Sequence, residues 1–138
     1  MVVFNPMRRI KVVAAMIRRE DGCYLITQRK PSATMPLLWE FPGGRVEDSE
    51  SDEAALAREL RQKMDIEVEV GRKAFRVEHT YPEYEIDFRV YHAYITGGKI
   101  EHLGVHDHRW VPHDELDQYE FPGADTRSMD MLLTGEDS

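Results

Sequence analysis

Hydrophobic and polar residues alternate with two different periods along this chain. Residues 11–17 are rich in Val, Ala and Ile and predict a buried strand, and the alternating residues 23–29 predict the strand that returns after a short turn. Residues 66–80 and 84–96 predict two longer strands. The apolar phase shifts after Val90, which predicts a bulge or burial on both faces of that strand.

Residues 51–64 show the clearest helical pattern. Leu56 and Leu60 are four residues apart, so they share one face of a helix. Ser49 or Ser51 can cap its N-terminus. Acidic residues fill the first turn, where their negative charge interacts favourably with the helix dipole. The segment therefore predicts a helix that packs its leucines on a core.

The order of elements predicts the fold class. A further strand ends at residues 110–111, and residues 129–133 predict a short final helix. Strands, helix, strands and helix in this order predict an α+β fold, or an α/β/α arrangement with a mixed sheet between helices. The length of 138 residues suits one domain, residues 1–138, with a sizeable core.

The charge balance narrows the partners. The net charge is -8, from 18 basic and 26 acidic residues. A long nucleic acid needs a basic protein face, so this balance argues against such a partner. A single nucleotide stays compatible, because a divalent cation can neutralise its phosphates.

The cellular context follows from simple features. Cys23 is the single cysteine, which excludes an internal disulfide and suits a reducing cytoplasm. No apolar run is long enough to span a membrane, and no apolar segment of a signal peptide follows the first residues. We therefore expect a cytoplasmic protein without a membrane partner, and the sequence leaves a homodimer open.

One motif carries most of the functional information. Its residues are, in order, Gly44, Glu50, Arg58, Glu59, Leu60 and Ile66. Their spacing resembles the Nudix box, G-x5-E-x7-R-E-U-x-E-E-x-G-U, where U is aliphatic. The resemblance implies the Nudix fold, an α/β/α sandwich, and hydrolysis of a nucleoside diphosphate linked to another group.

The chain departs from this box (residues 44–66) at the positions that bind the metal in the family. The two adjacent glutamates of the box fall on Gln62 and Lys63, and its second glycine falls on Asp65. Glu59 remains on the helical face where the family has three glutamates that hold Mg²⁺ or Mn²⁺. Gln62 offers only a neutral carbonyl oxygen, and Lys63 offers a positive charge that can pair with Glu59. We therefore expect a weakly bound or substrate-borne metal.

The resemblance also implies a role for each remaining box residue. It implies catalytic and metal-binding roles for Glu59 and Gln62, with a backbone carbonyl of Gly44 or its neighbour Gly43 as a further metal contact. Glu50 and Arg58 would stabilise the loop–helix–loop rather than take part in the chemistry. A turn at the end of a short strand is the alternative role for the two glycines.

Two segments outside the box, residues 25–29 ending in Arg29 and residues 121–125 ending in Asp125, resemble segments of the MutT-like branch, which hydrolyses nucleotides. Arg29 would contact a phosphate, or else it is a solvated residue beside Lys30. Asp125 would hydrogen-bond a base, or else it caps the final helix. Phe41 would stack near the base, or else it packs in the core.

A group of histidines lies before the late strand. His102, His106 and His108 surround Asp107, and strand alternation would put His106 and His108 on one face. Imidazoles in such an arrangement chelate Zn²⁺ or Ni²⁺. A solvated polar loop is the alternative. Asp107 or a histidine could also replace an acidic metal ligand that the family carries before its late Trp.

Two functions follow from these features. The first is a Nudix-type hydrolase of a nucleoside triphosphate (or a related nucleoside diphosphate compound) that releases the monophosphate and pyrophosphate. Its metal binding would be weak because Gln62 and Lys63 stand where the box has its paired glutamates. The second is a catalytically impaired Nudix-fold protein that binds a nucleotide or regulates another process. In both, the partner is a small nucleotide.

Overall fold

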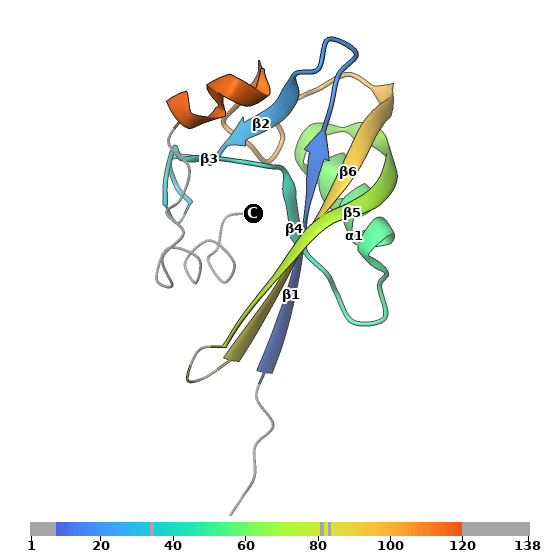
Figure 1. The fold of residues 1–138 in the computed structure, drawn as a ribbon, viewed down its shortest axis with the longest axis vertical. Helices are drawn as coiled ribbons and strands as arrows, with labels where there is room; N and C mark the ends of the chain where they lie inside the picture. Colours follow the sequence, from blue (N-terminus) through green and yellow to red (C-terminus); the bar gives the residue numbers. More distant parts are fainter. Residues whose placement is uncertain (1–7, 34, 81, 83, 120–138) are drawn as a thin grey trace, which may run out of the picture.

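The computed structural model describes residues 8–33, 35–80, 82 and 84–119. The strands are β1 (Arg8–Ile17), β2 (Tyr24–Gln28), β3 (Trp39–Glu40), β4 (Gly43–Arg45), β5 (Ile66–Thr80), β6 (Tyr84–Gly98) and β7 (Asp107–Val111). The helices are α1 (Asp52–Met64) and the 3₁₀ helix η1 (His113–Gln118). Figure 1 shows two groups of strands, with α1 beside the larger one.

The larger sheet is mixed, as predicted. Its strand order is β4-β1-β6-β5, with β1 parallel to β6 and the other two pairs antiparallel. A smaller antiparallel sheet has the order β3-β2-β7. The α+β class is therefore confirmed. The helix expected over residues 129–133, which would form the second helical layer, lies outside the described residues.

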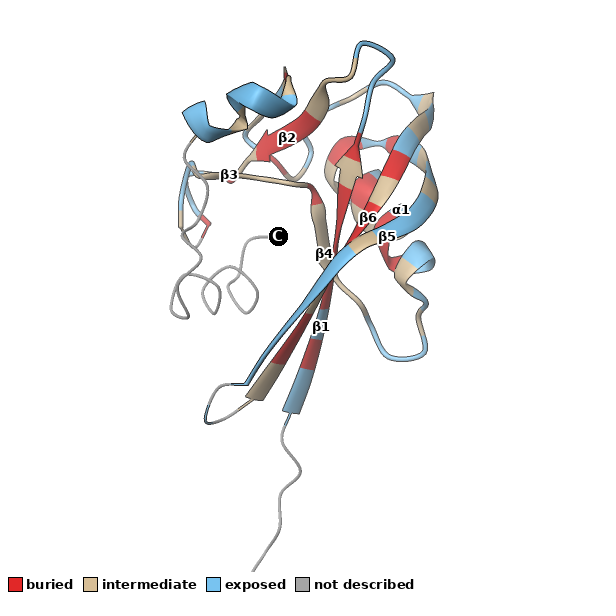
Figure 2. Ribbon diagram, viewed as in Figure 1, coloured by how far each residue is buried: buried red, intermediate tan, exposed pale blue. Residues whose placement is uncertain are grey.

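The core lies between α1 and the larger sheet. Leu56 and Leu60 are fully buried, as their spacing predicted, and they pack with Val13 of β1 and Ile66 of β5. Figure 2 shows this burial where α1 meets the sheet. The apolar stripe of α1 therefore fixes the face of the helix that carries the box residues.

Both ends of α1 have defined caps. Ser51, and not Ser49, is the N-cap, and its hydroxyl accepts a hydrogen bond from the Ala54 N–H at 3.1 Å. Asp65 ends the helix in a left-handed conformation with φ 57°, and its N–H donates to the Arg61 carbonyl at 2.9 Å. Asp65 thus takes the backbone shape that a glycine adopts at least cost.

The long hairpin differs from the sequence prediction in detail. The pairing of β5 with β6 shifts register at three places, all between residues 67 and 75 of β5. Consecutive Val90 and Tyr91 are both buried, so β6 is also covered on both faces. β6 runs through Gly97 and Gly98, two residues beyond the predicted strand of residues 84–96, because both glycines still pair with the start of β5. Likewise, Gly43 and Gly44 begin the short strand β4 rather than ending one.

Candidate functional site

Glu59 lies between two cationic side chains on α1. Its Oε1 accepts a hydrogen bond from Arg58 Nη1 at 3.0 Å. Its Oε2 lies 3.5 Å from Lys63 Nζ, so the predicted Glu59–Lys63 pair is confirmed. The Glu59 and Lys63 side chains are only 13% and 11% exposed. Both oxygens of this carboxylate are therefore already neutralised by the protein.

The glycines of β4 bring the backbone close to this carboxylate. A Cβ on Gly44 would lie 2.2 Å from Glu59 Cδ, and a Cβ on Gly43 would lie 2.0 Å from the Val13 carbonyl oxygen. Neither position has room for a side chain. Because β4 lies close to α1, Lys63 Nζ donates a hydrogen bond to the Gly43 carbonyl oxygen at 2.9 Å. The ammonium group thus bridges α1 and β4.

Arg58 holds the loop before α1 against the helix. It donates two hydrogen bonds to Glu50, at 2.8 and 3.0 Å, and a third to the Arg45 carbonyl at 2.9 Å. Glu50 also accepts the Glu47 N–H at 3.0 Å. Arg58, and then this N–H, lower the pKa of Glu50 to about 2. These contacts tie the loop before α1 to the helix.

A divalent cation does not fit the donor set at this position. Glu59 is the single carboxylate of its face, and two cations already engage it. The Gly43 carbonyl holds the Lys63 ammonium. Gln62 is exposed, and its amide oxygen lies 3.5 Å from Arg58 Nη1. A cation that needs several free oxygen ligands would have to displace Lys63 first.

The predicted substrate residues have different environments. Arg29 is buried rather than solvated beside Lys30, with its side chain 1% exposed and its Nη1 3.3 Å from Glu40 Oε2. Phe41 is partly buried and lies between β3 and β4. Both residues adjoin the β2–β3 pair. Asp125 lies outside the described residues.

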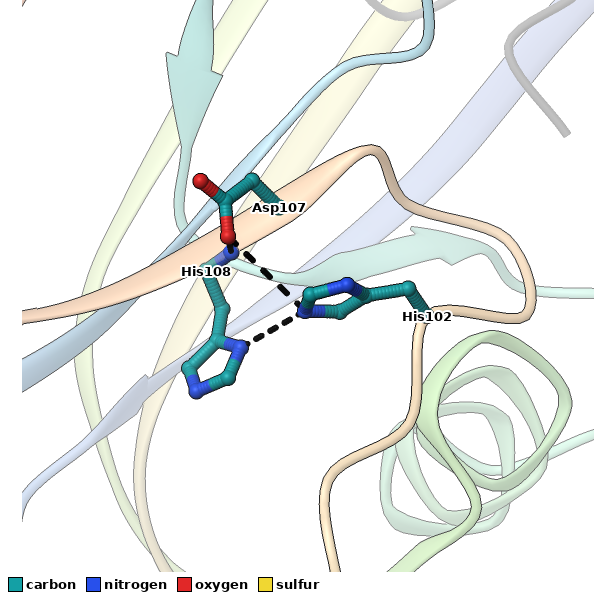
Figure 3. A group of neighbouring side chains, drawn as sticks. All are labelled: His102, Asp107 and His108. Carbon is teal, nitrogen blue, oxygen red and sulfur yellow. Dashed lines mark hydrogen bonds and ion pairs between the residues drawn. The ribbon is translucent and has the colours of Figure 1, made fainter.

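The histidine group forms, but with a different membership. His102 Nε2 lies 2.8 Å from His108 Nδ1 and 3.9 Å from Asp107 Oδ1 (Figure 3). His106 does not belong to this group. The strand begins only at Asp107, so strand alternation does not apply to His106, which is exposed. The expectation that His106 and His108 form the pair was therefore wrong.

The environment sets the charge of this group. Burial, and then the neighbouring His102, lower the pKa of His108. Burial opposes the charged form of Asp107, but the His108 N–H and Arg109 outweigh it, so the pKa of Asp107 is lowered. The group therefore offers an imidazole that tends to be neutral beside an ionised carboxylate.

Two other features were not predicted from the sequence. Asp87, which is 2% exposed, lies among Arg9, Arg76 and Arg89 at 2.7–2.9 Å. Burial opposes its ionisation, but the arginines outweigh that cost and lower the pKa of Asp87 to about 2. The available signal was Asp87 and Arg89 at the positions that alternate with the apolar Ile86, Phe88 and Val90.

The second feature is an open pocket of about 570 Å³ where the ends of β1 and β6 approach β7. Its lining residues are Arg18, Arg19, Glu20, Tyr94, Ile95 and Trp110. The Arg19 guanidinium lies 4.8 Å from the centre of the Trp110 ring. None of the predicted site residues that the structure describes lines this pocket.

Comparison with known proteins gives a consistent result. The family model described as NUDIX domain matches residues 13–131. A CTP pyrophosphohydrolase of Escherichia coli is 38% identical over 132 residues, which cover 92% of this chain and 93% of the relative. An 8-oxo-dGTP diphosphatase of Haemophilus influenzae is 32% identical, covering 90% and 91%. The solution structure of the E. coli ORF135 protein has a TM-score of 0.73 and 32% identity, covering 91% and 89%.

Among the described residues, no helix is both long enough and apolar enough to cross a membrane.

Proposed function

The chain belongs to the NUDIX domain family, and we propose that it hydrolyses a nucleoside triphosphate to the monophosphate and pyrophosphate with weak metal binding at the box. Relatives named as a CTP pyrophosphohydrolase and an 8-oxo-dGTP diphosphatase, which match nearly the whole chain, support this substrate class. The contact of Lys63 with Gly43 and Glu59 carries the second part of the proposal. A location in the cytoplasm and a homodimer stay predictions.

The proposed roles of the residues follow from their positions. Glu59 and Gln62 supply the oxygen ligands on the face of α1 where the family has three glutamates. Lys63 supplies a positive charge on the same face. A triphosphate arriving with its own Mg²⁺ or Mn²⁺ would be attracted by that charge rather than by a resident metal. Glu50 and Arg58 would keep the loop in place.

Substrate binding is proposed at Arg29 and Phe41, which adjoin the β2–β3 pair, together with Asp125. Arg29 would contact a phosphate, Phe41 would stack near the base, and Asp125 would hydrogen-bond the base. Arg29 is buried against Glu40, so contact with a phosphate requires the end of β2 to open or the pair to exchange partners. Asp125→Ala should weaken nucleotide binding by about 1–3 kcal/mol if the base loses a buried partner. Unchanged affinity with a lower melting temperature would indicate a helix cap instead.

A nucleotide-binding protein with little turnover is the second candidate. The observation that favours it is the occupation of both Glu59 oxygens and the Gly43 carbonyl by Arg58 and Lys63. These contacts satisfy the site without any added cation. A protein of this kind would retain affinity for the nucleotide and lack the chemistry.

One experiment separates the two candidates. Pyrophosphate release is measured over a panel of nucleotides that includes CTP and 8-oxo-dGTP, with Mg²⁺, with Mn²⁺ and with chelator, while calorimetry measures binding of the same nucleotides. Slow release that Glu59→Gln abolishes supports the hydrolase, and release that persists in Glu59→Gln indicates a contaminant. Binding without release supports the second candidate. The absence of both contradicts the proposal.

A further inference from the structure

We propose that His102, Asp107 and His108 bind a borderline transition-metal ion such as Zn²⁺, separately from the box. One ligand atom from each of the three residues lies within 4.8 Å of the other two. Two imidazoles and a carboxylate favour Zn²⁺, Ni²⁺ or Cu²⁺ over Mg²⁺, which prefers oxygen ligands. The proposal does not depend on the function assigned above.

The distances are close to those that a metal requires. Ligands at about 2.0–2.1 Å from a tetrahedral Zn²⁺ are separated from each other by about 3.3 Å. The two ring nitrogens are 2.8 Å apart, and the His102 nitrogen lies 3.9 Å from Asp107 Oδ1 (Figure 3). One separation must therefore widen by about half an ångström and the other must shorten by a similar amount. Rotation of the exposed His102 side chain supplies movements of this size.

The positions of the imidazole hydrogens on His102 and His108 also allow a metal ion to bind. A hydrogen held between His102 Nε2 and His108 Nδ1 accounts for their present contact. When each ring places its hydrogen on its other nitrogen, both facing nitrogens offer a lone pair to the same ion. Only the imidazole that holds the shared hydrogen therefore changes tautomer on binding, and that hydrogen stays on its own ring, so no net proton is lost.

The three ligands are held by the surrounding structure. Asp107 Oδ2 is bound by Arg109, and Asp107 Oδ1 accepts the His108 N–H at 2.8 Å, so the carboxylate keeps Oδ1 toward His102. Such outer contacts orient a metal-binding carboxylate.

The loop that carries His102 is anchored on both sides. The N–H groups of Glu101 and Leu103 donate to the Met64 and Lys63 carbonyls at the end of α1, at 2.9 and 3.0 Å. His102 lies between these two anchors and is therefore preorganised.

The site is open on one side. The His102 and Asp107 side chains are 39% and 30% exposed, so an ion can enter from solvent. Three protein ligands leave one tetrahedral position for water or for a group of a bound molecule. An exchangeable ion is expected rather than a structural one.

The test is a calorimetric titration of the purified full chain with Zn²⁺ in excess Mg²⁺. One ion should bind, and Co²⁺ at the same site should give the intense visible absorption of tetrahedral coordination. Loss of an outer contact costs about 10–100-fold in metal affinity, so His102→Ala and His108→Ala should each cost at least about tenfold. His106→Ala, in the same loop but outside the group, is the matched control and should change affinity little.

Other outcomes would overturn the proposal. One is a wild-type affinity for Zn²⁺ that His102→Ala and His108→Ala do not change. Another is an equal loss in His106→Ala, which would indicate scattered histidine binding. A loss in Glu59→Gln, with no loss in the histidine variants, would place the ion at the box. Circular dichroism and melting temperature show that each variant is folded before its titration is interpreted.

Discussion

The ammonium nitrogen of Lys63 lies 2.9 Å from the carbonyl oxygen of Gly43. This contact joins the last turn of α1 to β4, the two elements that flank the loop within the box. The same nitrogen lies 3.5 Å from Glu59, so one positive charge is shared by a carbonyl and a carboxylate. Lysine therefore occupies the position where a cation would meet these two oxygens.

The core prediction concerns the face that α1 buries. Leu56→Ala should lower the free energy of unfolding by about 2–5 kcal/mol, because Leu56 is fully buried against the sheet and leaves a cavity. Leu103→Ala is the control, since Leu103 is 53% exposed and should change stability by less than about 0.5 kcal/mol. Urea denaturation measures both. Similar losses in the two variants would mean that the helix does not pack as described.

The cap prediction concerns Asp65. Asp65→Gly should stabilise the protein by about 0.5–1 kcal/mol, because the left-handed conformation strains a residue with a Cβ and an acid opposes the helix dipole. Asp65→Asn removes the charge but keeps the Cβ, so it should give a smaller gain. Thermal and urea unfolding measure the two effects. A loss of stability in Asp65→Gly would show that the carboxylate makes a contact worth more than the strain.

The pH prediction concerns Asp87. Its pKa is about 2 in the folded state, below the ordinary value of 3.8, so its stabilising contribution is complete above about pH 4. That contribution is lost as the pH falls from about 4 towards 2, because the unfolded chain then binds the proton first. Asp87→Asn should lower stability at pH 7 by about 2–4 kcal/mol, since it leaves three arginines without their shared carboxylate.

The measurement for Asp87 is the difference in unfolding free energy between wild type and Asp87→Asn from pH 7 to pH 2. The difference should shrink below about pH 4. Asp117→Asn makes the same chemical change at an exposed position and should leave stability nearly unchanged at every pH. A difference that is constant with pH would contradict the ionised state of Asp87.

The sequence was sufficient to predict the elements whose apolar residues recur with a single period. The leucine stripe of α1 and the bounds of β5 followed from spacing, because burial of one face imposes that spacing. The Glu59–Lys63 pair followed from the helix alone, since residues four apart share a face.

Contacts between distant segments could not be predicted in this way. Lys63 meets Gly43 only because β4 runs beside the last turn of α1, and no local pattern encodes that approach. Of the three histidines considered together, His102 and not His106 lies beside His108 and Asp107, because the loop that carries His102 is anchored to the end of α1. Asp87 collects arginines from three strands, which depends on the register of the whole sheet.

The last prediction concerns the position that Lys63 occupies. Two unit charges about 4 Å apart at an effective dielectric near 20 interact by roughly 4 kcal/mol. Solvent at the surface reduces this repulsion, but a fraction of it would still lower the affinity for a divalent cation substantially. Removing the Lys63 charge and restoring the carboxylates should therefore both raise the affinity of the box for a divalent cation.

Gln62→Glu combined with Lys63→Glu removes the ammonium from Gly43 and Glu59 and places three carboxylates on one face of α1. Calorimetric affinity for Mn²⁺ should rise, and metal-dependent pyrophosphate release should appear or increase by orders of magnitude. Lys63→Met removes the charge without adding a ligand, so it should recover only part of the affinity. Glu59→Ala in the double variant should abolish the gain. If the wild-type chain already turns over nucleotides at about 1–10³ per second and the double variant changes nothing, the metal must act elsewhere.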